Sequence, residues 1–162
     1  MNEFDQALKF ALVWEGGDKI TDDPDDAGGL TKYGISKRAH PELDIVNLTE
    51  EQAAQIYRDE YWITGGCDSL PSPVNRVHFD ACVNHGIRNA NKFLQRSAGV
   101  ADDGRIGPIT LSAVQSMDPH LLAIAMISER NRFYQSIVDN NASQAKYLRG
   151  WLNRTKALMD SI

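Results

Sequence analysis

Hydrophobic positions near the N-terminus recur at intervals of three and four residues, which places them on one face of a helix. The pair Gly16-Gly17 follows this pattern and is a stop signal, so the predicted helix ends at or near Glu15. The predicted buried face consists of Phe4, Ala7, Leu8, Ala11 and Leu12.

The next stretch, residues 16–31, is rich in Asp and Gly and shows no helical pattern. Within and after it, residues 30–35, with the sequence LTKYGI, alternate in part between apolar and polar side chains and contain a glycine near the end. This pattern predicts one arm of a small β-hairpin, which we place near residues 26–35.

The rest of the chain is predicted to be helical from its start and stop signals. Thr49 and Gln52 form a capping-box pattern, and Pro73 suits the first turn of another helix. Asp118 followed by proline is the pattern of an N-cap and a first helical turn. The helices after the hairpin are predicted to begin near Thr49, Pro73, Asn89, Pro108 and Asp118, and Gly65, Gly86 and Gly99 end the first three. A last helix is predicted to carry the apolar positions from Leu148 to Ile162.

Composition and charge limit the classes of protein that the chain fits. Its 162 residues are 42% hydrophobic and 24% charged, which is typical of a compact globular protein. The net charge is −5 and no basic run occurs, so nucleic acid is not an expected partner. Charged residues interrupt the N-terminal apolar positions, so neither a signal peptide nor a membrane span is predicted. We interpret Cys67 and Cys82 as small buried hydrophobes rather than a disulfide.

One acidic residue lies where its surroundings would change its chemistry. At about 100° per residue, Glu15 falls on the same helix face as Phe4 and Leu8. A carboxyl group on an apolar face is expected to keep its proton, because desolvation disfavours the charged form. A protonated carboxyl near neutral pH is what a general acid needs to protonate a glycosidic oxygen. The alternative is a surface glutamate at a frayed helix end.

A second carboxylate is available in the irregular stretch, which contains four aspartates between Thr21 and Gly28. Hydrolysis of a sugar linkage uses one protonated acid and one ionised carboxylate, which positions water or stabilises the oxocarbenium charge. The alternatives are a solvated acidic turn and a calcium loop. An EF-hand pattern counted from Asp23 fails at its fifth and twelfth positions, which are Ala27 and Gly34.

Other chemistries find less support in the sequence. The four histidines include no pair spaced for zinc on one helical turn, and no thiolate pair accompanies them. Nucleophile-elbow, phosphate-loop and dinucleotide-binding motifs are absent. We therefore expect no metal and no cofactor.

Ordered blocks of sequence carry a resemblance to a known family. WEGG, DDPDDAGGLTKYGI and LTEEQAAQIYRDEYW resemble the N-terminal part of glycoside hydrolase family 108, the N-acetylmuramidases found among phage endolysins. FDACVNHG, FLQRSAGV, DGRIGPIT and GWLNR resemble the peptidoglycan-domain half that accompanies this family. Most members have Glu-Asn-Gly-Gly where this chain has Glu15-Gly16-Gly17, a departure that affects a loop position and keeps the acid.

The resemblance implies that Glu15 is the catalytic acid that cleaves the β-1,4 bond between N-acetylmuramic acid and N-acetylglucosamine. The family pattern places the second carboxylate at Asp26, whereas the order of Glu, Asp and Thr in phage-type lysozymes places it at Asp25. We favour Asp26 because the family match is closer. Thr31 is expected to hold the nucleophilic water and Tyr33 to stack on or hydrogen-bond to a sugar, with purely structural roles as alternatives of equal weight.

Two further candidates lie in the helix that ends at Gly86. Asp80 and Asn84 are four residues apart and share a helix face. If that face lines the cleft, they would bind amide and hydroxyl groups of the sugars, and a hydrogen-bonded helix interface is the equal alternative. The DGRIGPIT segment is interpreted as a turn followed by a helix, and the resemblance adds a contact with peptidoglycan.

The sequence therefore predicts a mainly α, lysozyme-like unit over residues 1–162, with a small β-hairpin next to the catalytic cleft. Residues 1–86 would form the catalytic part, and residues 87–162 the peptidoglycan-domain-like helical part packed against it. The predicted function is an endolysin-type N-acetylmuramidase acting on peptidoglycan glycan strands. A lytic transglycosylase and a non-catalytic peptidoglycan-binding module remain alternatives.

The expected setting is phage lysis. A monomer without stable membrane insertion would wait in the host cytoplasm until a holin releases it to the cell wall. A prophage remnant or a bacterial wall-remodelling enzyme would have the same sequence features.

Overall fold

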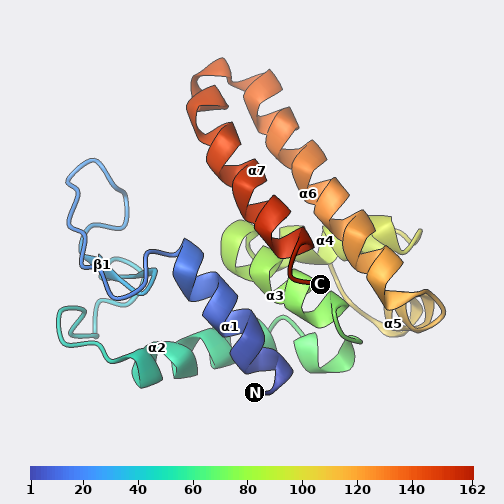
Figure 1. Cartoon of the computed structure of the whole chain (residues 1–162), viewed down its shortest axis with the longest axis horizontal. Helices are drawn as coiled ribbons and strands as arrows, with labels where there is room; N and C mark the ends of the chain where they lie inside the picture. Colours follow the sequence, from blue (N-terminus) through green and yellow to red (C-terminus); the bar gives the residue numbers. More distant parts are fainter. The chain divides into compact units, whose positions relative to one another are not determined.

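The computed structural model describes all 162 residues and shows a mainly α fold with one two-stranded sheet, which confirms the predicted fold class (Figure 1). Backbone contacts divide the chain into two compact units, Met1–Glu60 and Tyr61–Ile162. The predicted division into residues 1–86 and 87–162 stays a prediction. The elements are α1 (Glu3–Trp14), β1 (Thr31–Lys32), β2 (Ile35–Ser36), α2 (Glu50–Tyr57), η1 (Arg58–Ile63), η2 (Cys67–Ser69), α3 (Val74–His85), α4 (Ile87–Ser97), α5 (Pro108–Gln115), α6 (Pro119–Asn140), η3 (Ala142–Gln144) and α7 (Ala145–Met159).

The first helix, α1, has a defined signal at each end. Asn2 and Asp5 form a reciprocal capping box, with the Asp5 amide donating to the Asn2 side chain at 2.8 Å. At the other end the Gly17 amide donates to the Leu12 carbonyl oxygen at 2.9 Å, which is the six-to-one bond of a Schellman motif. The helix therefore ends where the two glycines predicted, and its apolar face is buried as expected.

The hairpin is short because its turn has a strict backbone requirement. Strands β1 and β2 pair antiparallel, with Lys32 opposite Ile35. The two residues between them, Tyr33 and Gly34, have φ values of 53° and 75°, as a type I′ turn requires. The hairpin, residues 31–36, overlaps the C-terminal half of the predicted region and extends one residue beyond it. The segment LTKYGI, predicted to be one arm, contains β1, the turn and the first residue of β2.

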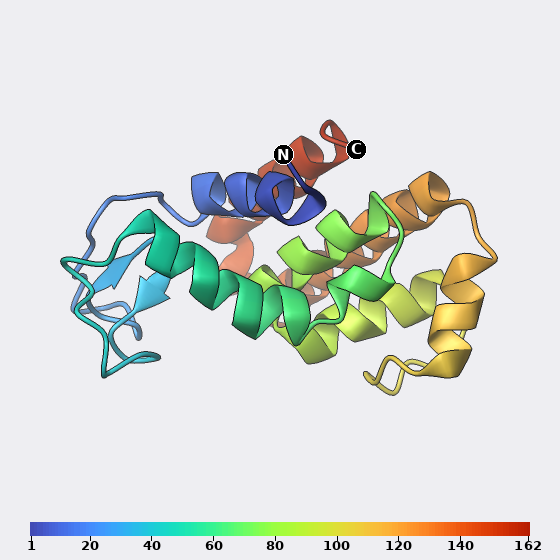
Figure 2. The same cartoon turned by 90° about the horizontal axis from the view of Figure 1, so that it is seen from below.

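Helix α2 begins at the capping box that the sequence predicted. The Gln52 amide donates to the Thr49 hydroxyl oxygen at 3.2 Å, and the Thr49 amide donates to the Gln52 side chain at 3.0 Å. Beyond Tyr57 the chain continues without a break as the π-helical segment η1, so that both form one rod in Figure 2. Gly65 and Gly66 follow this rod, as predicted.

The second unit is a bundle of helices around its own core. Helix α3 packs against α4 and α6, and α6 packs against α7. Figure 2 shows α3 and α4, in green and yellow-green, beside the orange α6. Helix α4 begins earlier than predicted, because Gly86, at φ 81°, is both the C-cap of α3 and the N-cap of α4. The apolar side chains of this core include Phe79, Phe93, Leu122, Met126, Ile127 and Leu158.

The two cysteines are buried free thiols, which confirms their interpretation. Their side chains are hydrogen-bonded to each other. The hydrogen bond with Cys67 lowers the pKa of Cys82 to about 5, and the nearby His78 acts in the same direction. The same bond, together with burial, raises the pKa of Cys67.

Candidate active site

Glu15 occupies the C-cap position of α1. Its backbone amide completes the last helical hydrogen bond, to the carbonyl oxygen of Ala11 at 2.9 Å. Gly16 and Gly17 have φ values of 92° and 59°, so the chain reverses direction immediately after the glutamate. The Glu15 side chain is half-buried. A rigid helix end therefore presents this carboxyl group at a fixed place in the first unit.

The tip of the hairpin packs against Glu15. The Tyr33 amide donates to the carbonyl oxygen of Gly17 at 2.9 Å, which ties the turn to the end of α1. A Cβ atom on Gly34 would lie 2.8 Å from Cβ and 3.2 Å from Cγ of Glu15, so the turn approaches the Glu15 side chain as closely as only a glycine permits. The hairpin predicted from LTKYGI thus forms one wall beside the predicted acid.

The aspartate-rich loop is closed at its base and folded on itself. Thr21 and Thr31 form an isolated antiparallel bridge, with amide–carbonyl distances of 2.9 and 2.8 Å. Within the loop, the Asp26 side chain accepts a hydrogen bond from the Gly28 amide at 2.9 Å. Asp25 and Asp26 are both exposed. Figure 1 shows the loop before β1 projecting beyond the hairpin and away from α1.

Thr31 and Tyr33 differ in what they present to a substrate. The Thr31 hydroxyl donates to the carbonyl oxygen of Gly29 at 2.9 Å, which leaves its oxygen lone pairs to accept a bond from water. Tyr33 is half-buried. Desolvation raises the pKa of Tyr33, and the negative charges of Glu50 and Asp18 raise it further, so its hydroxyl group is a proton donor at neutral pH.

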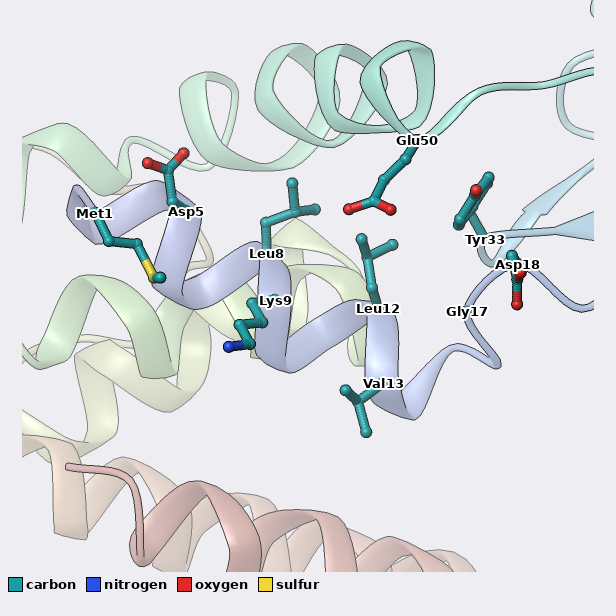
Figure 3. A pocket seen from close by; sticks show the side chains of 10 residues that line it. All are labelled: Met1, Asp5, Leu8, Lys9, Leu12, Val13, Gly17, Asp18, Tyr33 and Glu50. Carbon is teal, nitrogen blue, oxygen red and sulfur yellow. The ribbon is translucent and has the colours of Figure 1, made fainter.

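A pocket of about 800 Å³ in the first unit runs along α1 (Figure 3). Leu8 and Leu12 point toward Glu50, which lies near Tyr33, and Val13 points away from Glu50 on the other side of α1. Tyr33 is the one predicted site residue among its lining side chains. The complete lining is Met1, Asp5, Leu8, Lys9, Leu12, Val13, Gly17, Asp18, Tyr33 and Glu50.

Asp80 lies inside the second unit, where it is 1% exposed. One carboxylate oxygen accepts from Nη2 of Arg130 at 2.8 Å, and the other accepts from Nη2 of Arg154 at 2.7 Å. Burial by itself would raise the pKa of Asp80, but the two guanidinium charges outweigh burial and hold the pKa below its usual range. These contacts correct the expected substrate-binding role of Asp80 in favour of the alternative, a hydrogen-bonded helix interface, because its oxygens are enclosed and occupied.

Asn84, like Asp80, is hydrogen-bonded to a side chain of α6. Its side-chain oxygen accepts a hydrogen bond from the Tyr134 hydroxyl. Asn84 is half-buried, so binding of a sugar by its amide group stays a prediction. Beside it, desolvation and the charge of Arg130 lower the pKa of His85 to about 3, which keeps the imidazole neutral.

Sequence reasoning missed the two arginines that hold Asp80. A signal was present, because Arg130 lies four residues after Met126 and four before Tyr134, on the buried face of α6. A charged residue in the middle of an apolar face indicates a buried partner. The sequence does not show which acid it is, since Asp80 is 50 residues away from Arg130.

The DGRIGPIT segment is organised by one buried side chain, Gln95 of α4. Its Nε2 donates to the Asp103 carboxylate and to the Arg105 carbonyl oxygen, both at 2.9 Å, and its Oε1 accepts from the Gly104 amide at 2.8 Å. Helix α5 then begins at Pro108. The interpretation as a turn followed by a helix is confirmed, and contact of this segment with peptidoglycan stays a prediction.

Two family comparisons cover most of the chain. The family described as Glycosyl hydrolase 108 matches residues 8–86, which contain Glu15, the hairpin and its aspartate-rich loop. The family described as Predicted Peptidoglycan domain matches residues 89–156. The resemblance to family 108 N-acetylmuramidases is therefore confirmed, together with glycoside hydrolase activity on peptidoglycan as the activity that the family implies.

The fold of this chain also occurs among solved structures. The structure of SagA from Brucella abortus superimposes with a TM-score of 0.81 at 28% sequence identity. The similarity covers 98% of this chain and 92% of that chain. The comparison with curated proteins found no match.

No group of three or more His, Cys, Asp or Glu side chains is arranged to hold a metal ion. None of the helices combines the length and the apolar character needed to cross a membrane.

Proposed function

We propose that the chain is an N-acetylmuramidase that hydrolyses the β-1,4 bond between N-acetylmuramic acid and N-acetylglucosamine. The observation that carries this proposal is the placement of Glu15. A single glutamate is fixed at the rigid end of α1, half-buried against the hairpin tip, within the residues that match family 108. A general acid needs this combination of a defined position and partial exclusion of water.

The remaining roles follow from the chemistry of glycoside hydrolysis. Glu15 gives its proton to the glycosidic oxygen as the bond to the anomeric carbon breaks. Asp26 stays ionised and either directs a water molecule to the anomeric carbon or stabilises the positive charge that develops there. Thr31 accepts a hydrogen bond from that water, and the Tyr33 ring contacts a sugar.

Mass spectrometry of muropeptides released from purified peptidoglycan tests the proposal. The native protein is expected to release products with reducing-end N-acetylmuramic acid, and Glu15→Gln is expected to release none. Glu42→Gln is the matched control, because Glu42 is an exposed glutamate whose side chain is 67% accessible beside His40. The control should be as active as the native protein.

Other product patterns would support the alternatives. Anhydro-muramic ends would identify a lytic transglycosylase, in which a hydroxyl group of the substrate replaces the attacking water. No soluble product from the native protein, together with retention on peptidoglycan, would identify a binding module.

The second carboxylate is tested by two isosteric variants. In Asp26→Asn the amide oxygen still accepts from the Gly28 amide, so the loop keeps the hydrogen bond seen at 2.9 Å while the charge is lost. We expect Asp26→Asn to lose at least about 100-fold in kcat and Asp25→Asn to stay near the native value. The reverse result would assign the role to Asp25.

For the biological setting we propose phage lysis, in which a monomer accumulates in the host cytoplasm and a holin gives it access to the wall. Expression in a bacterial host with and without a holin tests this idea. Rapid lysis is expected only with the holin, and lysis without it would contradict the proposed dependence. Light scattering after gel filtration would measure the mass of the particle and so test the monomer.

A further inference from the structure

Tyr57, the last residue of α2, joins the hairpin tip to the environment of Glu15. Its side chain is 2% exposed, and its hydroxyl group donates to the carbonyl oxygen of Tyr33 at 2.9 Å. The amide of the same Tyr33 donates to the carbonyl oxygen of Gly17 at 2.9 Å. The peptide groups of one turn residue are thus held by α2 on one side and by the end of α1 on the other.

Gly34 is the point at which these elements meet. A Cβ atom at this position would lie 2.5 Å from the Tyr57 hydroxyl oxygen and 2.8 Å from Cβ of Glu15. Both distances are shorter than side-chain contacts allow. The Tyr57 hydroxyl group, at the end of α2, and the Glu15 side chain, at the end of α1, therefore both lie against the Cα atom of Gly34.

We propose that Tyr57 and Gly34 act as positioning residues for Glu15. Tyr57 holds the turn in place through Tyr33, and Gly34 lets the turn close on the Glu15 side chain without a gap. This inference rests on the proposed function, because it matters only if Glu15 is the acid. A displacement of a catalytic group by about 1 Å can lower the rate about 100-fold, so small changes in this contact have measurable effects.

The first test is Tyr57→Phe, which removes the hydroxyl group and keeps the ring. We expect kcat on purified glycan strands to fall about 10-fold with KM unchanged, because the substrate is still bound while the acid is less well placed. A residue that only stabilises the fold would lower Tm and leave the kcat of the folded enzyme unchanged.

The second test is Gly34→Ala, compared with Gly99→Ala. Both glycines have left-handed backbones, with φ values of 75° and 72°, but a Cβ atom on Gly99 would meet nothing within 4 Å. The two variants therefore carry similar backbone strain and differ in the contact with Tyr57 and Glu15. We expect Gly34→Ala to lose about 100-fold in kcat and Gly99→Ala to keep native kcat.

The double variant Gly34→Ala/Tyr57→Phe separates positioning from independent damage. The phenylalanine removes the oxygen atom that the new methyl group would contact at 2.5 Å. We expect the double variant to be no less active than Gly34→Ala alone. Independent effects would multiply to a loss of about 1,000-fold, because the free energies of uncoupled substitutions add.

The outcomes distinguish this inference from the proposed function. Native activity in Glu15→Gln would refute the proposed function. If Glu15→Gln is inactive but Tyr57→Phe has native kcat and KM, the positioning role is wrong and the muramidase proposal stands. Multiplicative losses in the double variant would likewise overturn the coupling of Gly34 and Tyr57.

Discussion

Asp80 is charged in the interior of the second unit because two guanidinium groups surround it. Each carboxylate oxygen has its own arginine partner, at 2.8 Å from Arg130 and 2.7 Å from Arg154. A buried ion that loses its partner costs far more than an exposed one, since water cannot replace the lost interaction. Asp80 therefore joins α3 to both α6 and α7.

Replacing Asp80 by Asn tests this role. The substitution leaves two buried arginines without a counter-charge, so we expect the free energy of unfolding to fall by about 3 to 5 kcal/mol. Urea titration followed by circular dichroism would measure the change. Asp160→Asn is the control, because Asp160 forms an ion pair with Lys156 on the surface and its loss should shift the midpoint very little. Equal effects of both substitutions would contradict the assignment.

At the scale of elements, local sequence signals determine where a helix begins, and tertiary contacts determine which loop its side chains hold in place. Helix α2 starts at the Thr49 cap, and its last residue, Tyr57, reaches the hairpin tip. Helix α4 carries Gln95, whose amide group binds the backbone of the turn before α5. Each of these two helices therefore holds a loop through a side chain that lies well after the residue at which the helix begins: α2 holds the hairpin turn, and α4 holds the turn before α5.

The cap of α2 can be tested by Thr49→Ala. The substitution leaves the Gln52 amide without the hydroxyl acceptor seen at 3.2 Å, and we expect a loss of about 1 kcal/mol in unfolding free energy. Thr49→Ser keeps the hydroxyl group and should stay close to the native protein. Thermal unfolding of the three proteins would show the order, and a serine variant as unstable as the alanine variant would contradict the capping role.

The turn before α5 can be tested by Gln95→Leu, which fills similar space without hydrogen bonds. The Gly104 amide would lose its buried acceptor at 2.8 Å, so we expect destabilisation by about 2 kcal/mol. Hydrogen exchange should increase mainly in residues 102–107. Unchanged exchange in that segment would show that Gln95 does not hold the turn.

At the scale of the whole molecule, stability depends on pH through the second unit. This unit contains a half-buried imidazole, His85, beside the pair of arginines that hold Asp80. His85 has a folded-state pKa of about 3, well below the usual value of about 6.5. Because the unfolded chain binds a proton there more readily, its contribution to stability is complete above pH 6.5 and decreases as the pH falls toward 3.

We therefore expect the unfolding midpoint to decrease between pH 7 and pH 4. Asp80 adds to the loss at the acidic end, since its pKa is also held below the usual range in the folded state. Urea titrations at several pH values would measure the dependence. His85→Gln keeps an acceptor for Arg130 but does not titrate, so its pH dependence should be flatter. A variant with the native slope would exclude His85 as the cause.

The sequence by itself determined the helix boundaries that depend on local signals. These signals act within a few residues of the chain, so they can be recognised in the sequence without knowledge of the fold. They are the caps at Thr49 and Asp118, the stop at Gly16-Gly17 and the glycine-containing hairpin turn. It also identified Glu15 as the acid candidate, because helical periodicity places that residue relative to an apolar face.

Only the tertiary structure decided which side chains meet. The partners of Asp80 are 50 and 74 residues away, and the contact of Tyr57 with Tyr33 spans 24 residues. Packing of separate helices creates these pairs, and no local pattern encodes them. For the same physical reason, two polar residues that share a helix face in the sequence, Asp80 and Asn84, are bound to side chains of other helices in the fold.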